Sequence, residues 1–84
     1  MEDKKIIDVR SRTEFMGGHV AGSINIPLQE IPEHVDEIKN MGNTVFCCAS
    51  GNRSGQAVSY LKTQGVNCEN GGGWMELNFK IQNR

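Results

Sequence analysis

The sequence predicts an α/β domain with a central parallel sheet flanked by helices. Short apolar runs alternate along the 84-residue chain with segments whose apolar residues recur at helical spacing. The run Thr44–Cys47 has no polar and apolar alternation, which favours a strand buried on both faces of a parallel sheet. Linkers, repeats and low-complexity tracts are absent from the sequence. We therefore expect one domain over residues 1–84.

The first predicted elements are a strand and a short helix. Lys5–Val9 carries closely spaced apolar residues and forms the strand. Either Ser11 or Thr13 can cap the helix that follows, because a hydroxyl accepts a hydrogen bond from a free amide at a helix start. Gly17 and Gly18 end this helix.

The middle of the chain supplies two strands with a helix between them. Ser23–Ile26 is the second strand, and Pro27 stops it because proline has no amide hydrogen to donate. In Pro32–Met41 the apolar residues recur at helical spacing, so this segment is predicted to be a helix that ends at Gly42. Thr44–Cys47 is the third strand.

The last third of the chain repeats the alternation. Ser54–Gln64 is predicted to be a helix with one apolar face, ended by Gly65. Val66–Glu69 is the last strand, Gly71–Gly73 is a flexible turn, and Trp74–Ile81 is a closing helix. Strands that alternate with helices in this way favour a parallel sheet.

Composition excludes several classes of function. Nine Lys and Arg residues stand against ten Asp and Glu residues without a basic block, so nucleic acid is not an expected partner. The apolar runs are too short to cross a membrane, and the charged start MEDKKIIDV does not fit a secretory signal. We expect a cytoplasmic protein whose three cysteines are reduced. No cysteine or histidine spacing is typical of a metal site, so no metal is expected.

The stretch CCASGNRS at positions 47–54 lies where the third strand turns into a helix. Ligands gather at this edge of parallel sheets. Gly51 and Asn52 can adopt positive φ angles, which point successive amide hydrogens inward and bind an anion. These amides, the helix start at Ser54 and the charge of Arg53 should each lower the pKa of a loop cysteine. We therefore predict a cysteine nucleophile that attacks an oxyanion-bearing substrate.

Two adjacent cysteines leave two candidates for the nucleophile. Five residues separate Cys47 from Arg53, which is the C-x5-R arrangement of cysteine-dependent phosphatases. Four residues separate Cys48 from Arg53, and this spacing resembles the active-site loop of rhodaneses. The loop alone satisfies both patterns.

The rest of the chain resembles the rhodanese family. The segment IDVRSRTEFMGGHVAGSINIP at positions 7–27 is similar to a long and specific motif of that family, and VFCCASGNRSG, SYLKTQGV and GGGW follow in the family order. The sequence departs from the family pattern in one respect, since we do not expect the first edge strand that many members carry before the DVR motif. Cell-cycle phosphatases share the rhodanese fold, so the motif does not exclude them. The resemblance implies a small three-layer rhodanese-like domain with Cys48 as the catalytic residue and a substrate-binding loop of Ala49, Ser50, Gly51, Asn52, Arg53 and Ser54.

The function implied by this resemblance is sulfur transfer without a cofactor. Cys48 would take a sulfane sulfur from thiosulfate or a similar small donor as a persulfide. The sulfur would then pass to cyanide, to a thiol or to a protein acceptor, and Arg53 would position the anionic donor. Because sulfur is released to such acceptors, we expect a shallow pocket. Two alternatives stay open: a phosphatase or arsenate reductase that uses Cys47, and a non-catalytic rhodanese-like binding module.

Other residues are predicted to be structural. Cys47 and Cys68 are expected to be small buried strand residues. As an alternative to binding the substrate, Arg53 could form a structural ion pair with Asp8 or Glu69. The remaining scaffold candidates are Asp8 and Arg10 in the first loop, His19, and the helical core stripe of Trp74, Leu77 and Ile81.

Overall fold

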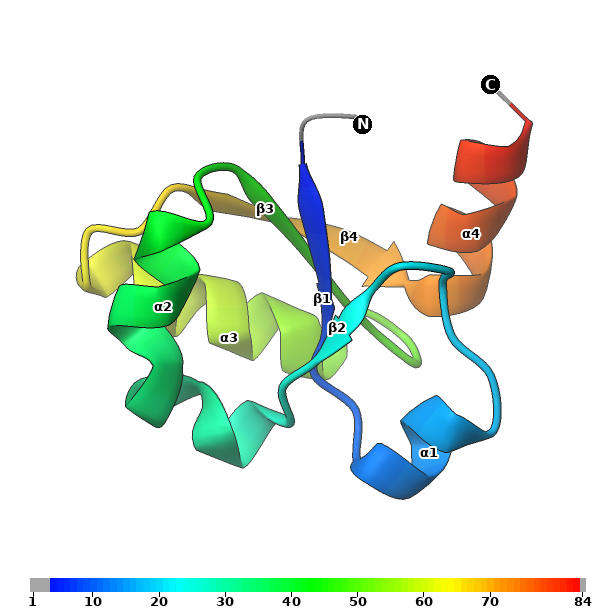
Figure 1. Cartoon of the computed structure of the whole chain (residues 1–84), viewed down its shortest axis with the longest axis horizontal. Coiled ribbons are helices and arrows are strands. Elements are labelled where there is room, and N and C mark those ends of the chain that lie inside the picture. Colours follow the sequence, from blue (N-terminus) through cyan, green and yellow to red (C-terminus); the bar gives the residue numbers. More distant parts are fainter. Residues whose placement is uncertain (1–3, 84) are drawn as a thin grey trace.

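The computed structural model describes residues 4–83 and contains a four-stranded parallel sheet between two layers of helices. The strand order is β2-β1-β3-β4. The strands are β1 (Lys5–Asp8), β2 (Ile24–Asn25), β3 (Thr44–Cys48) and β4 (Cys68–Gly73). The helices are α1 (Arg12–Met16), the 3-10 helix η1 (Leu28–His34), α2 (Val35–Asn40), α3 (Asn52–Thr63) and α4 (Trp74–Gln82). Figure 1 shows α2 and α3 on one side of the sheet and α4 on the other. The predicted three-layer α/β class is confirmed.

Buried residues form one cluster on each face of the sheet. The larger cluster lies beneath η1, α2 and α3 and contains Phe46 and Cys48. The smaller lies beneath α4 and contains Val45, Cys47 and Leu77. Successive side chains of a strand point to opposite faces, which accounts for this division of β3. The two adjacent cysteines therefore point in opposite directions.

The direction of the connections changes between β1 and β3, at the centre of the sheet. The chain leaves β1 toward β2 on one side and leaves β3 toward β4 on the other. In open α/β sheets, ligands bind where the connections diverge in this way, outside the carboxyl ends of the strands. α1 follows β1 at this edge, and the loop of residues 49–51 follows β3.

Helix α1 begins with a reciprocal pair of capping hydrogen bonds. The Glu14 amide donates to the Ser11 hydroxyl at 3.2 Å, and the Ser11 amide donates to the Glu14 carboxylate at 2.9 Å. Two amides that the short helix would leave unpaired are thus satisfied. Ser11 is the cap, rather than Thr13, and α1 ends at Gly17 as predicted.

The helix predicted over Pro32–Met41 is divided in two. The 3-10 helix η1 contains Pro32, and the α-helix begins only at Val35. Proline has no amide hydrogen and its ring clashes with the preceding turn, so a regular α-helix does not extend from Leu28 across Pro32. Proline is compatible with a helix that begins at it, so this does not explain why the α-helix starts only at Val35.

The glycines predicted to form a flexible turn belong to β4. Cys47 lies opposite Gly72, and Cys48 lies opposite Gly73, with a bulge that leaves Gly71 without a partner. A Cβ atom on Gly71 would lie 2.7 Å from Cγ1 of Val45. Glycine is therefore required for β4 to pass this close to β3, and the last strand extends to the level of Cys48. None of the helices in residues 4–83 has the length and apolar character needed to cross a membrane.

Candidate active site

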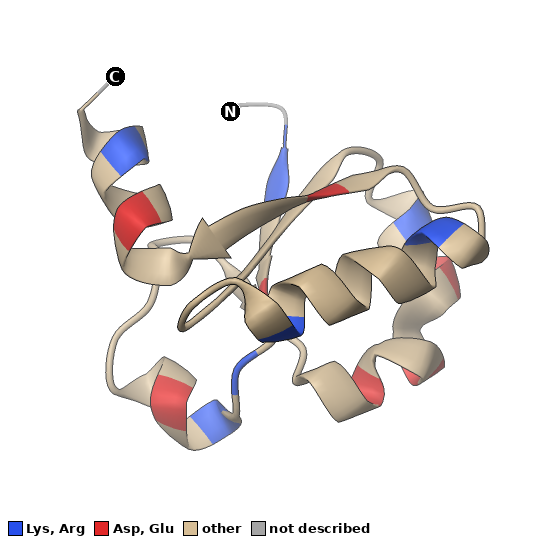
Figure 2. Ribbon diagram, turned by 180° about the vertical axis from the view of Figure 1, so that it is seen from behind, with Lys and Arg blue, Asp and Glu red and all other residues tan. Residues whose placement is uncertain are grey.

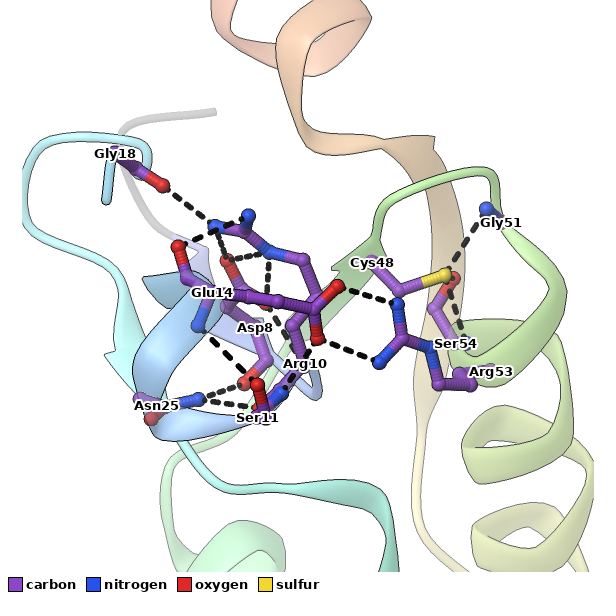
Figure 3. A network of polar contacts seen from close by, with 10 residues as sticks. All are labelled: Asp8, Arg10, Ser11, Glu14, Gly18, Asn25, Cys48, Gly51, Arg53 and Ser54. Carbon is purple, nitrogen blue, oxygen red and sulfur yellow. Dashed lines mark hydrogen bonds and ion pairs between the residues drawn. The ribbon is translucent and has the colours of Figure 1, made fainter. Parts of the chain in front are cut away.

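The Cys48 side chain lies at the end of β3, beneath the start of α3. Its Sγ accepts hydrogen bonds from the amide of Gly51 at 3.0 Å and from the amide of Ser54 at 3.4 Å. The Ser54 hydroxyl is also 3.4 Å from the sulfur. Figure 3 shows these three donors around Sγ. Cys48 is 0% exposed, so its thiol is covered by the loop and does not lie in the shallow open pocket expected from the sequence.

One glycine gives the loop its turn. Gly51 has a φ angle of 98°, in the left-handed region that other residues rarely adopt. The prediction that Asn52 shares this conformation is wrong, because no non-glycine residue in the described chain has a positive φ. Asn52 instead begins α3, two residues earlier than predicted. The positive end of a twelve-residue helix thus lies beside Cys48.

The loop shifts the Cys48 thiol toward the thiolate. Burial raises its pKa, but hydrogen bonds from the Ser54 hydroxyl and then from the amides of Ser54, Ser50 and Gly51 lower the pKa to about 7. Hydrogen bonds to a charged form favour that form. These donors are the main cause of the lowering. The loop amides were expected from the sequence together with the helix start and the charge of Arg53, but the Ser54 hydroxyl was not.

The other two cysteines are buried strand residues, as predicted. Burial first, and the nearby charge of Asp8 second, raise the pKa of Cys47 to about 12. Burial also raises the pKa of Cys68. Cys68 lies opposite Thr44 in the register, four residues from Cys48 along β3, which corresponds to about 13 Å at the rise of a strand. Neither thiol lies beside the Cys48 sulfur.

Arg53 is held by a carboxylate that the sequence analysis did not identify. Its Nη1 donates to Oε1 of Glu14 at 2.8 Å, and its Nη2 donates to Oε2 at 3.0 Å (Figure 3). This two-point contact joins the start of α3 to helix α1. The hydrogen bond from Arg53, followed by the one from the Ser11 amide, lowers the pKa of Glu14 to about 2. Glu14 is therefore a carboxylate throughout the neutral range.

The two partners proposed for Arg53 from the sequence are engaged elsewhere. Glu69 pairs with Lys4 at the other end of the sheet. Asp8 pairs with Arg10, whose Nη2 lies 2.7 Å from Oδ2 of Asp8. The prediction that Arg53 forms an ion pair with Asp8 or Glu69 is thus wrong, because its partner is Glu14.

Asp8 and Arg10 form the scaffold beneath the site. Asp8 is 0% exposed and Arg10 is 5% exposed. Arg10 also donates to the carbonyl oxygens of Gly18 at 2.7 Å and Glu14 at 3.3 Å, and its guanidinium lies 4.7 Å from the ring centre of Trp74. These contacts tie the end of β1 to α1 and α4, which confirms the predicted role in holding the first loop.

His19 is also held within the first loop. Its ring stacks on Phe15 with centroids 3.7 Å apart, and Nδ1 lies 2.7 Å from the Phe15 carbonyl oxygen. This agrees with a structural role. Within residues 4–83, no group of three or more histidine, cysteine or carboxylate side chains could hold a metal ion.

Asn70 is a second site residue that the sequence analysis missed. Its Oδ1 accepts from the Ser54 hydroxyl at 2.7 Å and from the Gly72 amide at 3.0 Å, and its Nδ2 donates to the Gly51 carbonyl at 3.1 Å. It thereby fixes β4 against the loop and orients the hydroxyl beside Cys48. Its only signal in the sequence is a polar residue before three glycines, which a turn explains equally well.

Residues 1–78 match the family described as Rhodanese-like domain. The chain belongs to this family. Thiosulfate sulfurtransferase PspE of Escherichia coli is 38% identical over 74 residues, which cover 84% of this rhodanese-like domain and 71% of PspE. A protein named Sulfurtransferase from Allochromatium vinosum is 36% identical over 64 residues, or 76% of this chain. The match covers 60% of the length of that relative. The Bacillus subtilis protein YqhL is 38% identical over 61 residues, which cover 73% of this chain and 48% of YqhL. The chain thus spans only about half to three fifths of the length of these two relatives.

Solved structures agree with the family. The structure described as rhodanese with anions from E. coli superposes on this rhodanese-like domain with a TM-score of 0.77 and 35% identity. The match covers 86% of this chain and 88% of that one.

Proposed function

We propose that this rhodanese-like domain is a sulfurtransferase that carries a sulfane sulfur as a persulfide on Cys48. The observation that carries the proposal is the set of hydrogen-bond donors around the Cys48 sulfur, which lower its pKa to about 7. A thiolate is the nucleophilic form of cysteine, and here it is available near neutral pH. The sulfurtransferase names of two relatives support the same reaction class.

The proposed reaction has two displacement steps. With thiosulfate as donor, the Cys48 thiolate attacks the outer sulfur, the sulfur–sulfur bond of the donor breaks, and sulfite leaves with the electron pair. In the second step cyanide or a thiolate attacks the outer sulfur of the Cys48 persulfide, and the Cys48 thiolate is released. The amides of Gly51 and Ser54 already point at the sulfur and can stabilise the negative charge of both forms. Each step is a displacement at sulfur with a stable leaving group, first sulfite and then the Cys48 thiolate, so neither step requires a cofactor.

The covered position of Cys48 adds a requirement. Because the residue is 0% exposed, a donor can reach Sγ only when the loop above it moves. Ala49, Ser50 and Asn52 of this loop are exposed, so the movement has to break mainly the hydrogen bond from Asn70 to the Gly51 carbonyl and the packing of Gly51 on Gly72. The donor, the acceptor and the cytoplasmic location expected from the sequence remain predictions.

Two observations oppose the alternative with Cys47 as nucleophile, although its spacing to Arg53 fits. Cys47 packs beneath α4 with Val45 and Leu77, on the face of β3 opposite to the loop amides. Its pKa is raised to about 12, so it is a thiol at neutral pH. A phosphatase or arsenate reductase mechanism through Cys47 is therefore not proposed.

The mass of the intact protein after incubation with thiosulfate tests the proposal. Wild type should gain one sulfur atom, and Cys48→Ser should gain none, because a serine hydroxyl is too weakly acidic to attack. Cys47→Ser is the matched control and should gain one sulfur as wild type does. A sulfur that stays on Cys48→Ser protein would refute the proposed nucleophile. An unmodified wild type, tested with thiosulfate and with a persulfide donor, would favour the binding module.

A further inference from the structure

Arg53, the cation expected to bind an anionic donor, is already paired with the Glu14 carboxylate. Both Nη atoms of Arg53 are engaged by the two carboxylate oxygens of Glu14, at 2.8 and 3.0 Å. Glu14 is fixed in turn, because its Oε1 accepts the Ser11 amide at 2.9 Å in the cap of α1. A donor that used the same face of Arg53 would have to displace a carboxylate held at three points.

The remaining arginines of the described chain are paired too. Arg10 binds Asp8, and Arg12 binds Glu30. Lysine residues do not compensate. Lys4 pairs with Glu69. The others lie at the start of β1 and in the last turns of helices: Lys5, Lys39, Lys62 and Lys80. In Figure 2, where Lys and Arg are blue, blue segments lie at the far end of α3, on α4 and at the start of β1, away from the start of α3. The active loop therefore offers backbone dipoles to an anion but no unpaired cation from residues 4–83.

These charges bear on the choice of sulfur donor. Thiosulfate carries two negative charges, and its sulfonate would lie near the Glu14 carboxylate or would have to replace it. The persulfide of a thiol carries at most one charge at its sulfur end, which the loop amides alone can accept. We propose that Glu14 sets the donor specificity, so that the site takes sulfur from thiol persulfides in preference to thiosulfate. This inference rests on the proposed sulfur transfer through Cys48.

The transfer from a persulfide is balanced without any further reactant. The Cys48 thiolate attacks the outer sulfur of a hydropersulfide RSSH and forms a new sulfur–sulfur bond. The bond between the two donor sulfurs breaks, and the thiolate RS⁻ leaves with its electron pair. The outer sulfur and its proton stay on Cys48, and RS⁻ can take a proton from water.

The variant Glu14→Gln removes the negative charge beside Arg53 and keeps the hydrogen bonds that hold the start of α1. Glutamine still accepts the Ser11 amide in the helix cap, which is formed equally by glutamate or glutamine. It also keeps one oxygen for Arg53, but it removes the negative charge. Glu30→Gln is the matched control, since it removes the same charge from an exposed pair with Arg12 that does not contact the loop.

The donor preference can be measured from single-turnover loading of Cys48 with sulfur. The donor is thiosulfate or freshly prepared cysteine persulfide, and the mass of the intact protein reports the loading. In wild type the half-saturating concentration should be lower for cysteine persulfide than for thiosulfate. Glu14→Gln should lower the value for thiosulfate at least fivefold and change that for cysteine persulfide less than twofold. The maximal loading rates should change little. Added salt should weaken thiosulfate binding more steeply in Glu14→Gln than in wild type, because salt screens the newly unpaired Arg53. Glu30→Gln should match wild type.

Three outcomes would overturn the inference. If wild type loads with both donors but the ratio of their half-saturating concentrations is the same in Glu14→Gln, Glu14 does not set specificity. If Glu14→Gln weakens thiosulfate binding, Glu14 positions Arg53 for the donor instead of opposing it. Both of these leave the proposed sulfur transfer intact. If wild type gains sulfur from neither donor, the proposed function fails and the inference fails with it.

Discussion

Ser54 has one hydroxyl proton and two acceptors within reach. Asn70 Oδ1 lies 2.7 Å from the hydroxyl oxygen, and Cys48 Sγ lies 3.4 Å away. A hydroxyl can donate to only one of them at a time. In the thiol form, Cys48 can donate to Ser54 while Ser54 donates to Asn70. In the thiolate form the charged sulfur is the stronger acceptor, so the Ser54 proton turns toward it. Asn70 competes for this proton and limits how far Ser54 lowers the pKa of Cys48.

Removing the hydroxyl should make Cys48 less acidic. We expect Ser54→Ala to raise the pKa of Cys48 above about 7, because the largest of the hydrogen bonds that lower it is lost. The midpoint of the alkylation rate against pH measures the change. Ser50→Ala is the control, because it keeps the amide that faces the sulfur and should leave the midpoint unchanged. An unchanged midpoint in Ser54→Ala would mean that the amides alone set the acidity.

The cysteines should differ sharply in their reaction with iodoacetamide. Cys48 has a lowered pKa, so its rate should rise with pH through about 7 and level off above it. Cys47 and Cys68 have raised pKa values and are buried, and should stay unreacted in the folded protein. Peptide mapping assigns the adduct. Since loop movement limits access to Cys48, the plateau rate should lie below that of a small exposed thiol of equal pKa. Equal reaction at all three cysteines would contradict this prediction.

Strand β4 depends on the absence of a side chain at its bulge. Gly71→Ala should destabilise the fold by roughly 1–3 kcal/mol, the range for overpacked core sites. The cause is the 2.7 Å approach of the new Cβ to Val45 Cγ1. Urea unfolding measures the loss. Gly17→Ala is the control, since Gly17 has a helical φ of −77° and its nearest contact to a new Cβ is 3.4 Å. Equal stability of the two variants would show that β4 can shift away from β3.

The elements predicted well from the sequence are those with a local signal. β1 and β3 have dense apolar residues, α1 has its capping serine, and α3 has one apolar face. β4 was predicted only in part, because its glycines have low strand propensity and their role depends on packing against β3. The contact between Arg53 and Glu14 joins residues 39 positions apart. A spacing rule finds the arginine of the loop but not the carboxylate that neutralises it.

The covering of Cys48 could not be predicted from the sequence either. The strand–loop–helix pattern correctly placed a cysteine at the carboxyl edge of the sheet. Exposure, however, depends on how closely β4 and α3 approach that edge. Gly51 packs against Gly72, where a new Cβ on Gly51 would lie 3.2 Å from the Cα of Gly72. Only the assembled fold shows this contact.

The stability of the whole domain depends on the buried pair of Asp8 and Arg10. This pair joins β1 to α1 and α4, so its loss should loosen both layers at the carboxyl edge. Asp8→Asn leaves the charge of Arg10 buried without a counter-charge, which typically costs about 3–5 kcal/mol. A domain has only about 5–15 kcal/mol of total stability, so this variant should be near its folding limit. Urea unfolding followed by Trp74 fluorescence measures the loss. Glu30→Gln should be close to wild type, and a stable Asp8→Asn protein would contradict this prediction.

The spacing of the three cysteines determines what oxidants do to this domain. A cysteine oxidised to a sulfenic acid is protected from further oxidation when it condenses with another thiol. Cys47 points to the opposite face of β3, and Cys68 lies about 13 Å along the strand from Cys48. The folded chain therefore has no second thiol to resolve an oxidised Cys48. Peroxide should drive Cys48 to the sulfinic acid, seen as a gain of two oxygen atoms, unless an external thiol is present. The thiol that accepts sulfur from this site would then also be the thiol that rescues it.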